Sequence, residues 1–141
     1  MMVNQISIFL ENKYGKLNEL LTLLSQENIR IIAATVADTT EFGILRMIVT
    51  DAGKTYRLLK NSNVNVNLTE VLAIAAQPSV DSFAGILTHF TNAGLSIEYM
   101  YCFSVKDKAF LILRVNNSEA ALEIIRRNNI EYITENELNN L

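Results

Sequence analysis

The chain repeats its own apolar pattern at an offset of 66 residues, and this internal repeat restricts the possible folds more than any other feature. A helical spacing of apolar side chains occurs twice, first at Leu17, Leu20, Leu21 and Leu24 and again at Phe83, Ile86, Leu87 and Phe90. A strand-like alternation also occurs twice, at Gly43, Leu45, Met47 and Val49 and at Ala109, Leu111, Leu113 and Val115. A chain of 141 residues with such a repeat is best interpreted as two copies of one small unit.

Each copy is predicted to contain a strand, a helix, two strands, a helix and a final strand. In the first copy, strands are expected at 3–10, 29–37, 42–50 and 64–68, and helices at 16–27 and 52–60. In the second copy, strands are expected at 71–76, 95–104, 108–115 and 130–134, and helices at 82–92 and 118–127. Asp51 directly precedes one of these helices and is expected to cap its N-terminus.

This order of elements predicts an α+β fold of two ferredoxin-like βαββαβ modules, each with an antiparallel sheet that carries its helices on one face. The modules are expected at 1–68 and 69–141. No linker rich in Pro, Gly or Ser separates them, because 64–76 is almost continuous in β-forming residues and 67–69 is the one plausible break. The modules are therefore expected to be tightly coupled, and an exchange of strands between them is compatible with the sequence.

The predicted sheets carry apolar side chains on both faces, which indicates a further packing partner. The strand expected at 29–37 includes Ile31, Ile32, Ala33, Ala34 and Val36, and other strands add Ile44, Ile48, Phe110 and Ile112 to the second face. Burying an aliphatic side chain of this size stabilises a protein by about 1.5–3 kcal/mol, so leaving a whole face in water is costly. We therefore expect the sheets to pack on a partner, most simply each other or a second chain, and we expect two chains to form a homodimer.

Charge and hydropathy argue against several classes of partner. The formal net charge is −3 and no cluster of Lys and Arg occurs, so neither nucleic acid nor a membrane surface is expected as a partner. No apolar segment reaches the ~18 residues that cross a bilayer, and the N-terminal sequence lacks the basic flank of a secretory signal. The one cysteine, Cys102, cannot form a disulfide within the chain. These features together predict a cytoplasmic location.

No set of residues suited to catalysis or to metal binding is evident in the sequence. With one histidine, His89, and one cysteine, most general-base and thiol mechanisms lack their groups. No phosphate-binding Gly loop, nucleophile elbow or metal-ligand spacing occurs. The chain is therefore expected not to be an enzyme and to need no cofactor. An RNA-recognition module of the same topology is disfavoured, because Arg46 is the one basic residue on the predicted first and third strands.

One stretch of the sequence carries a recognisable signature. Residues 10–17 read Leu-Glu-Asn-Lys-Tyr-Gly-Lys-Leu, and a β-type segment that starts Asn-Ile-Arg-Ile follows at 28–31. This stretch resembles the ACT-domain family, in which a polar loop ending in Gly opens the first helix, and the resemblance covers the whole chain as two copies. It implies a small-molecule-sensing regulatory protein that binds a free amino acid at the interface of its modules.

The resemblance and the chemistry of the loop point to the same ligand-binding residues. Gly15 allows a sharp turn and a close approach of the ligand, and the N-terminus of the following helix favours a carboxylate. Asn12 stands where many family members carry a side-chain amide, a group that can both donate and accept hydrogen bonds. The implied set is Glu11, Asn12, Lys13, Tyr14, Gly15, Lys16 and Leu17, together with Arg30 and Ser96 at the starts of the two second strands. Each residue also has a purely structural interpretation, as a turn residue, a helix cap or a solvated surface group.

The two loops are expected to differ in their ability to bind a ligand. The first carries Tyr14 where the family commonly has Pro. The second places Pro78 opposite Asn12 and Asp81 opposite Gly15, which removes the amide and adds a charge that repels a carboxylate. One competent site is therefore expected. The alternative function is a ligand-free protein-interaction module or a regulatory subunit of a metabolic enzyme, which explains the apolar sheet faces without a ligand.

Overall fold

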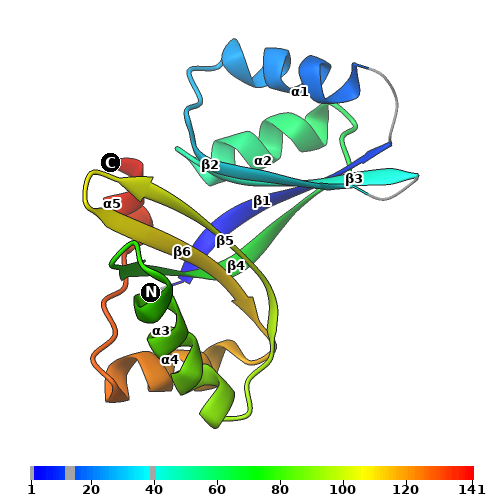
Figure 1. Ribbon diagram of the computed structural model, residues 1–141. Coiled ribbons are helices and arrows are strands. Elements are labelled where there is room, and N and C mark those ends of the chain that lie inside the picture. The colour runs from blue at the N-terminus through cyan, green and yellow to red at the C-terminus, as the bar shows by residue number, and fades with distance from the viewer. Residues whose placement is uncertain (1, 12–14, 39–40) are drawn as a thin grey trace. The chain divides into compact units, whose positions relative to one another are not determined.

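The structure, a computed structural model, describes residues 2–11, 15–38 and 41–141, and its elements follow the predicted order with one helix added (Figure 1). The first half contains β1 (Met2–Glu11), α1 (Lys16–Ser25), β2 (Ile31–Asp38), β3 (Phe42–Val49), α2 (Ala52–Asn61) and β4 (Val66–Ala76). The second half contains α3 (Val80–Asn92), β5 (Ile97–Val105), β6 (Lys108–Val115), α4 (Ser118–Arg127) and α5 (Glu135–Asn139). Every helix among the described residues is too short or too polar to cross a membrane.

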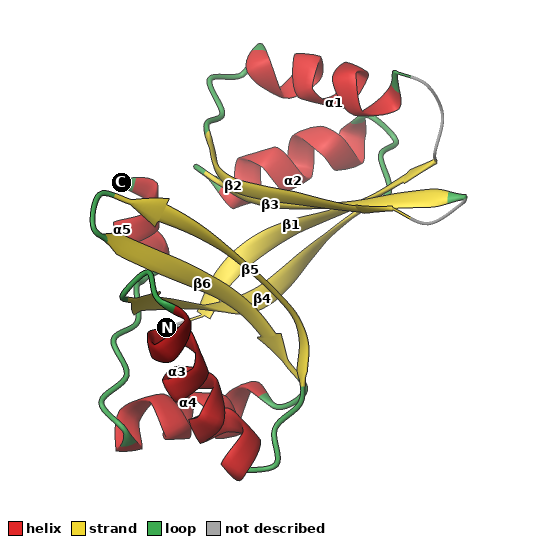
Figure 2. Cartoon of the chain, viewed as in Figure 1, coloured by secondary structure: helices red, strands yellow, loops and turns green. Residues whose placement is uncertain are grey.

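The chain forms two compact modules, each an antiparallel sheet with helices on one face (Figure 2). The first module is Asn4–Thr69, and the second is Glu70–Leu141 together with the first residues of β1. In the first module the strand order is β2-β3-β1-β4, which is the ferredoxin-like order predicted from the sequence. The register is set by pairs such as Ile8 with Leu45 in β1 and β3, and the backbone N–H of Phe9 donates to the carbonyl of Asn65 at 3.0 Å.

The second module repeats this order with a shortened last strand. β5 pairs with β6 and β6 pairs with β4, whose far side carries one isolated bridge from Ile74 to Tyr132. The predicted strand at 130–134 is therefore reduced to a few residues. The cause lies at Thr134, which caps α5 by accepting a hydrogen bond from the backbone N–H of Glu137 in a capping box. The chain turns into a helix that the sequence analysis did not predict.

Each module has its own apolar core between its sheet and its helices. The first core contains Ile6, Ile8, Leu20, Leu24, Leu45, Met47, Val49, Ala52, Leu59 and Val66. The second contains Leu72, Ile74, Phe90, Leu111, Leu113, Val115, Ala121, Ile124 and Ile125. The helical and alternating patterns that revealed the repeat supply nine of these nineteen side chains, so the repeat in the sequence is in large part a repeat of the core.

β4 is continuous where the sequence analysis expected a break. The strand runs from Val66 to Ala76, so the predicted interruption at 67–69 is wrong. The polar side chains at this point are accommodated within the strand, because the hydroxyl of Thr69 lies 2.9 Å from the hydroxyl of Ser7 on β1. Ser7 in turn accepts a hydrogen bond from the amide of Gln5, which is fully buried. Polar residues whose groups are paired in this way do not interrupt a strand.

Candidate functional site

The loop between β1 and α1 ends in a glycine whose backbone is left-handed. Gly15 has φ 83° and ψ −5°, stands at the N-cap of α1, and accepts a hydrogen bond on its carbonyl from the N–H of Glu19 at 2.9 Å. A Cβ added to Gly15 would meet no atom within 4 Å, so the glycine is needed for its backbone conformation and not for lack of space. Asn12, Lys13 and Tyr14 lie outside the described residues.

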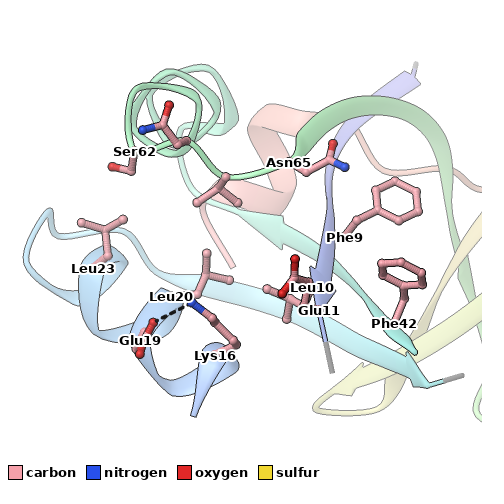
Figure 3. A pocket seen from close by; sticks show the side chains of 12 residues that line it. Phe9, Leu10, Glu11, Lys16, Glu19, Leu20, Leu23, Phe42, Ser62 and Asn65 are labelled. Carbon is pink, nitrogen blue, oxygen red and sulfur yellow. Dashed lines mark ion pairs between the residues drawn. The ribbon is translucent and has the colours of Figure 1, made fainter. Parts of the chain in front are cut away.

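A pocket of about 490 Å³ opens beside this loop, wholly within the first module (Figure 3). Its lining comes from the end of β1, the first two turns of α1, the start of β3 and the segment that follows α2. The lining residues are Phe9, Leu10, Glu11, Lys16, Glu19, Leu20, Leu23, Phe42, Ser62, Asn63, Val64 and Asn65. The volume falls in the range typical of small-molecule sites.

The inner part of the pocket is aliphatic. Leu20 is 5 % exposed and belongs to the core of the module. Leu10, Leu23 and Val64 are half-buried and pack against that core. This part of the pocket offers no charged group, so it suits an apolar portion of a ligand.

The outer part of the pocket is polar and carries both signs of charge. Nζ of Lys16 lies 3.6 Å from a carboxylate oxygen of Glu19, one turn further along α1, and Glu11 lies at the end of β1. Ser62 and Asn65 add uncharged polar groups from the opposite side (Figure 3). An exposed ion pair of this kind is held by roughly 1 kcal/mol or less, so its members can exchange partners readily.

The predicted ligand residues are brought together only in part. Glu11 and Lys16 line the pocket, whereas Leu17 is exposed on α1 and is not among the lining residues. Arg30 lies at the opposite end of the sheet from the loop, because β2 begins beside Val49 while Glu11 pairs with Phe42. Within one module, Arg30 and the loop therefore do not form one site.

The starts of the two second strands are held in the same way in both modules. The backbone N–H of Arg30 donates to the Thr50 hydroxyl at 3.0 Å, and the backbone N–H of Ser96 donates to the Asn116 side chain at 3.0 Å. Thr50 and Asn116 return a backbone hydrogen bond to Arg30 and Ser96, respectively. These contacts give both residues a structural role at the start of a strand.

The corresponding loop of the second module differs more than the sequence repeat indicated. α3 begins at Val80 and is capped by the side chain of Ser79, which accepts from the N–H of Ser82. Asp81, which aligns with Gly15, therefore lies in the first turn of the helix, because α3 begins two residues earlier in the repeat than α1 does. The backbone of Gln77 donates to the Ser82 hydroxyl at 3.2 Å, which ties the loop to the helix.

The second module also differs at the positions that correspond to the pocket. The hydrogen bond from Phe9 to Asn65 recurs as one from the N–H of Ala75 to the carbonyl of Glu131, at 2.9 Å. Where the first module has Phe42 and Asn65, the second has Lys108 and Glu131, whose charged groups lie 2.7 Å apart. An ion pair thus joins two elements that border the pocket in the first module.

Sequence reasoning missed the far wall of the pocket, which is formed by Phe42 and the segment from Ser62 to Asn65. One signal was available in Asn63, since Asn adopts left-handed backbone readily and here has φ 60°. A second signal lay in the repeat itself, which aligns Phe42 with Lys108 and Asn65 with Glu131. Aligned positions that differ in chemical character indicate where the two copies have diverged.

The remaining residues considered from the sequence have structural surroundings. The alternation of Tyr99, Tyr101 and Phe103 in the sequence predicts that they share one face, and they do so on β5, where Phe103 stacks on Phe110 with ring centroids 5.3 Å apart. A lone Cys in an apolar strand is expected to be buried, but Cys102 is exposed, on the other face of a strand that pairs with β6 along one edge. Among the described residues, no group of His, Cys, Asp and Glu is arranged to hold a metal ion.

Comparison with known proteins places the whole chain in one family. The family model described as an ACT domain pair matches residues 1–141. A protein from Bacteroides thetaiotaomicron with a solved crystal structure is 35% identical in sequence to this chain. The structural match covers 100% of this chain and 98% of that protein's chain, with a TM-score of 0.95. The regulatory subunit of aspartate kinase from Thermus thermophilus is 13% identical over 89% of this chain and 93% of its own, with a TM-score of 0.62. No protein of curated function matches the sequence.

Proposed function

The chain belongs to the ACT-domain family as an ACT domain pair, and we propose that it is a regulatory protein that binds a free amino acid. The observation that supports this proposal is the coincidence of the predicted loop with the pocket of the first module. Glu11 and Lys16, which the sequence put forward as ligand residues, both line that pocket beside the helix N-terminus at Gly15. In this proposal the protein is not an enzyme. It regulates by changing between a ligand-free and a ligand-bound state.

The proposed ligand contacts come from the Glu11–Leu17 loop and from a second strand of a neighbouring module. The ligand's carboxylate would meet the backbone N–H groups at the start of α1, and the Asn12 amide would meet its ammonium or carboxylate. The neighbouring strand would contribute from its start, at Ser96 or at Arg30. The loop at Gln77–Asp81 would bind weakly, because Ser79 and Ser82 already satisfy its backbone.

Edge strands support the proposal that two chains form a homodimer. β2 and β5 stand at the ends of the strand order, so each has one described partner strand. Ile31 is 40 % exposed and Val36 is 50 % exposed on β2, and Met100 is 40 % exposed on β5. An exposed, apolar edge is a ready template for pairing with another chain. Such pairing would also bring a second strand close to another chain's loop.

The second candidate function is a ligand-free regulatory subunit. The solved relative from Thermus thermophilus is the regulatory subunit of aspartate kinase, and the exposed edges just described would serve equally to bind a metabolic enzyme. The two candidates differ in one measurable respect. A sensor binds a free amino acid in the absence of the enzyme, whereas a pure interaction module does not.

A thermal-shift screen against the twenty amino acids tests the proposal, because a ligand that binds only the folded state raises the melting temperature. Calorimetry on Asn12→Ala then locates the site, with an expected loss of roughly 1–3 kcal/mol in binding free energy from the unmatched polar partner. Gln77→Ala, in the second loop, is the matched control and should bind as the unchanged protein does. Absence of any shift would favour the ligand-free alternative, and equal losses in both variants would mean that the two loops share the binding.

A further inference from the structure

We propose that the pocket beneath α1 is the side-chain subsite of the first module and that it selects amino acids with uncharged, apolar side chains. This inference rests on the proposed function, which leaves the identity of the amino acid open. In this arrangement the ligand's ammonium and carboxylate lie at the polar mouth of the pocket and its side chain enters the aliphatic part.

The aliphatic part of the pocket determines the selectivity. Leu10, Leu20, Leu23 and Val64 come from three different elements and leave an apolar surface beside the module's core. A leucine-sized side chain gains about tenfold or more in affinity from such burial. A side chain that carries a charge would lose its hydration there without gaining a partner.

The mouth of the pocket fits the two charges that every free amino acid carries. Lys16 can meet a carboxylate, and Glu19 lies 3.6 Å from it, where an ammonium bound beside the carboxylate would be stabilised. The side chains of both residues are about half exposed or more, at 47% and 71%, so the ligand's groups can replace their mutual contact without a large loss. Opposite charges at the mouth and an apolar interior are together complementary to a zwitterion with an apolar side chain.

The second module carries different groups at the positions around this space. Lys108 and Glu131 occupy the positions of Phe42 and Asn65, and their ion pair at 2.7 Å joins the start of β6 to the segment after α4. The residues that correspond to Lys16 and Glu19 are Ser82 and Gly85, so the charged pair of the mouth is missing as well. The subsite is therefore proposed for the first module alone.

The test is calorimetry with a matched pair of ligands, norleucine and lysine, which differ by the terminal ammonium of the side chain. The unchanged protein should bind norleucine at least about tenfold more tightly than lysine. The variant Val64→Phe adds a ring to the aliphatic part from a half-buried position and should lose norleucine binding by a similar factor. The control is K54Q/E27Q, which removes an exposed ion pair of the same module that does not line the pocket.

Each outcome decides between the two proposals. Lysine binding as tight as norleucine binding, or Val64→Phe binding norleucine like the unchanged protein, overturns the subsite and leaves the proposed function standing. Absence of binding by any amino acid overturns both. If Val64→Phe does not fold by circular dichroism, Leu23→Phe takes its place, since Leu23 also lines the aliphatic part from a half-buried position. Unchanged norleucine affinity in that variant overturns the subsite.

Discussion

The two modules share a fold and a core but differ at one end of the sheet. In the first, α1 follows a glycine at φ 83° and a pocket lies beside the loop. In the second, α3 follows a serine whose side chain caps the helix, and an ion pair joins the elements that would border a pocket. The comparison teaches that the repeated pattern secures the core and the strand pairing, while the loop before the first helix is free to differ in length and capping.

The opposite end of each module has stayed alike. Asp51 and Asn117 cap α2 and α4 from equivalent positions, each accepting a hydrogen bond at 3.1 Å from a backbone N–H three residues on. At this end Asp51 and Asn117 both cap a helix although the residue types differ. At the pocket end the two modules differ in both residues and contacts. Changes in the core and caps should destabilise both modules, by amounts that the local burial and backbone conformation at each position determine.

The largest expected effect on stability comes from core substitutions in the first helix of each module, α1 and α3. Phe90 is fully buried and is the one buried side chain of α3, whereas α1 buries both Leu20 and Leu24. Phe90→Ala should lower the free energy of unfolding by about 3–5 kcal/mol through the cavity it leaves. Leu24→Ala, at the equivalent position, should cost less because Leu20 remains. Urea unfolding followed by circular dichroism measures both, and a larger loss for Leu24→Ala would contradict this comparison.

The helix caps offer a finer test, with an effect of about 1–3 kcal/mol. Asn117→Ala should cost about 1 kcal/mol, the usual value of an N-cap side chain. Asp51→Ala should cost roughly 1–2 kcal/mol more, because Asp51 has φ 52° and an alanine is strained there. Asp51→Gly separates the two causes, since glycine adopts that backbone without strain. Thermal unfolding would disprove the comparison if Asp51→Ala and Asn117→Ala lowered the melting temperature equally.

The smallest expected effect concerns the ion pair that joins β6 to the segment after α4 in the second module. Lys108 and Glu131 have side chains 49% and 62% exposed, so their contact is screened by water and salt. Lys108→Gln should change the free energy of unfolding by less than about 1 kcal/mol, and the difference should disappear near 1 M salt. Unfolding curves of the variant at low and high salt provide the measurement. A loss that persists in salt would mean that the pair is more than a surface contact.

The sequence predicted the fold well and the site only in outline, for physical reasons. Core side chains recur with the period of their helix or strand, so the two cores and most element boundaries could be inferred from spacing alone. The uninterrupted β4 and the short helix after Thr134 could not, because a paired hydroxyl and a capping box are local contacts without a periodic signal. The wall formed by Phe42 and Val64 was missed because it joins residues that are distant in sequence and were not part of the loop signature.

β4 carries a constraint on how this sequence can change. Val66 gives its side chain to the first core, and Leu72 and Ile74 give theirs to the second. Side chains of a strand alternate with a period of two residues, so Val66, Leu72 and Ile74, at even separations, lie on the same face of β4. An insertion of two residues between them preserves this alternation, whereas one inserted residue reverses it unless a bulge absorbs it. The number of residues between the two sets of core side chains is therefore under selection as well as their identity.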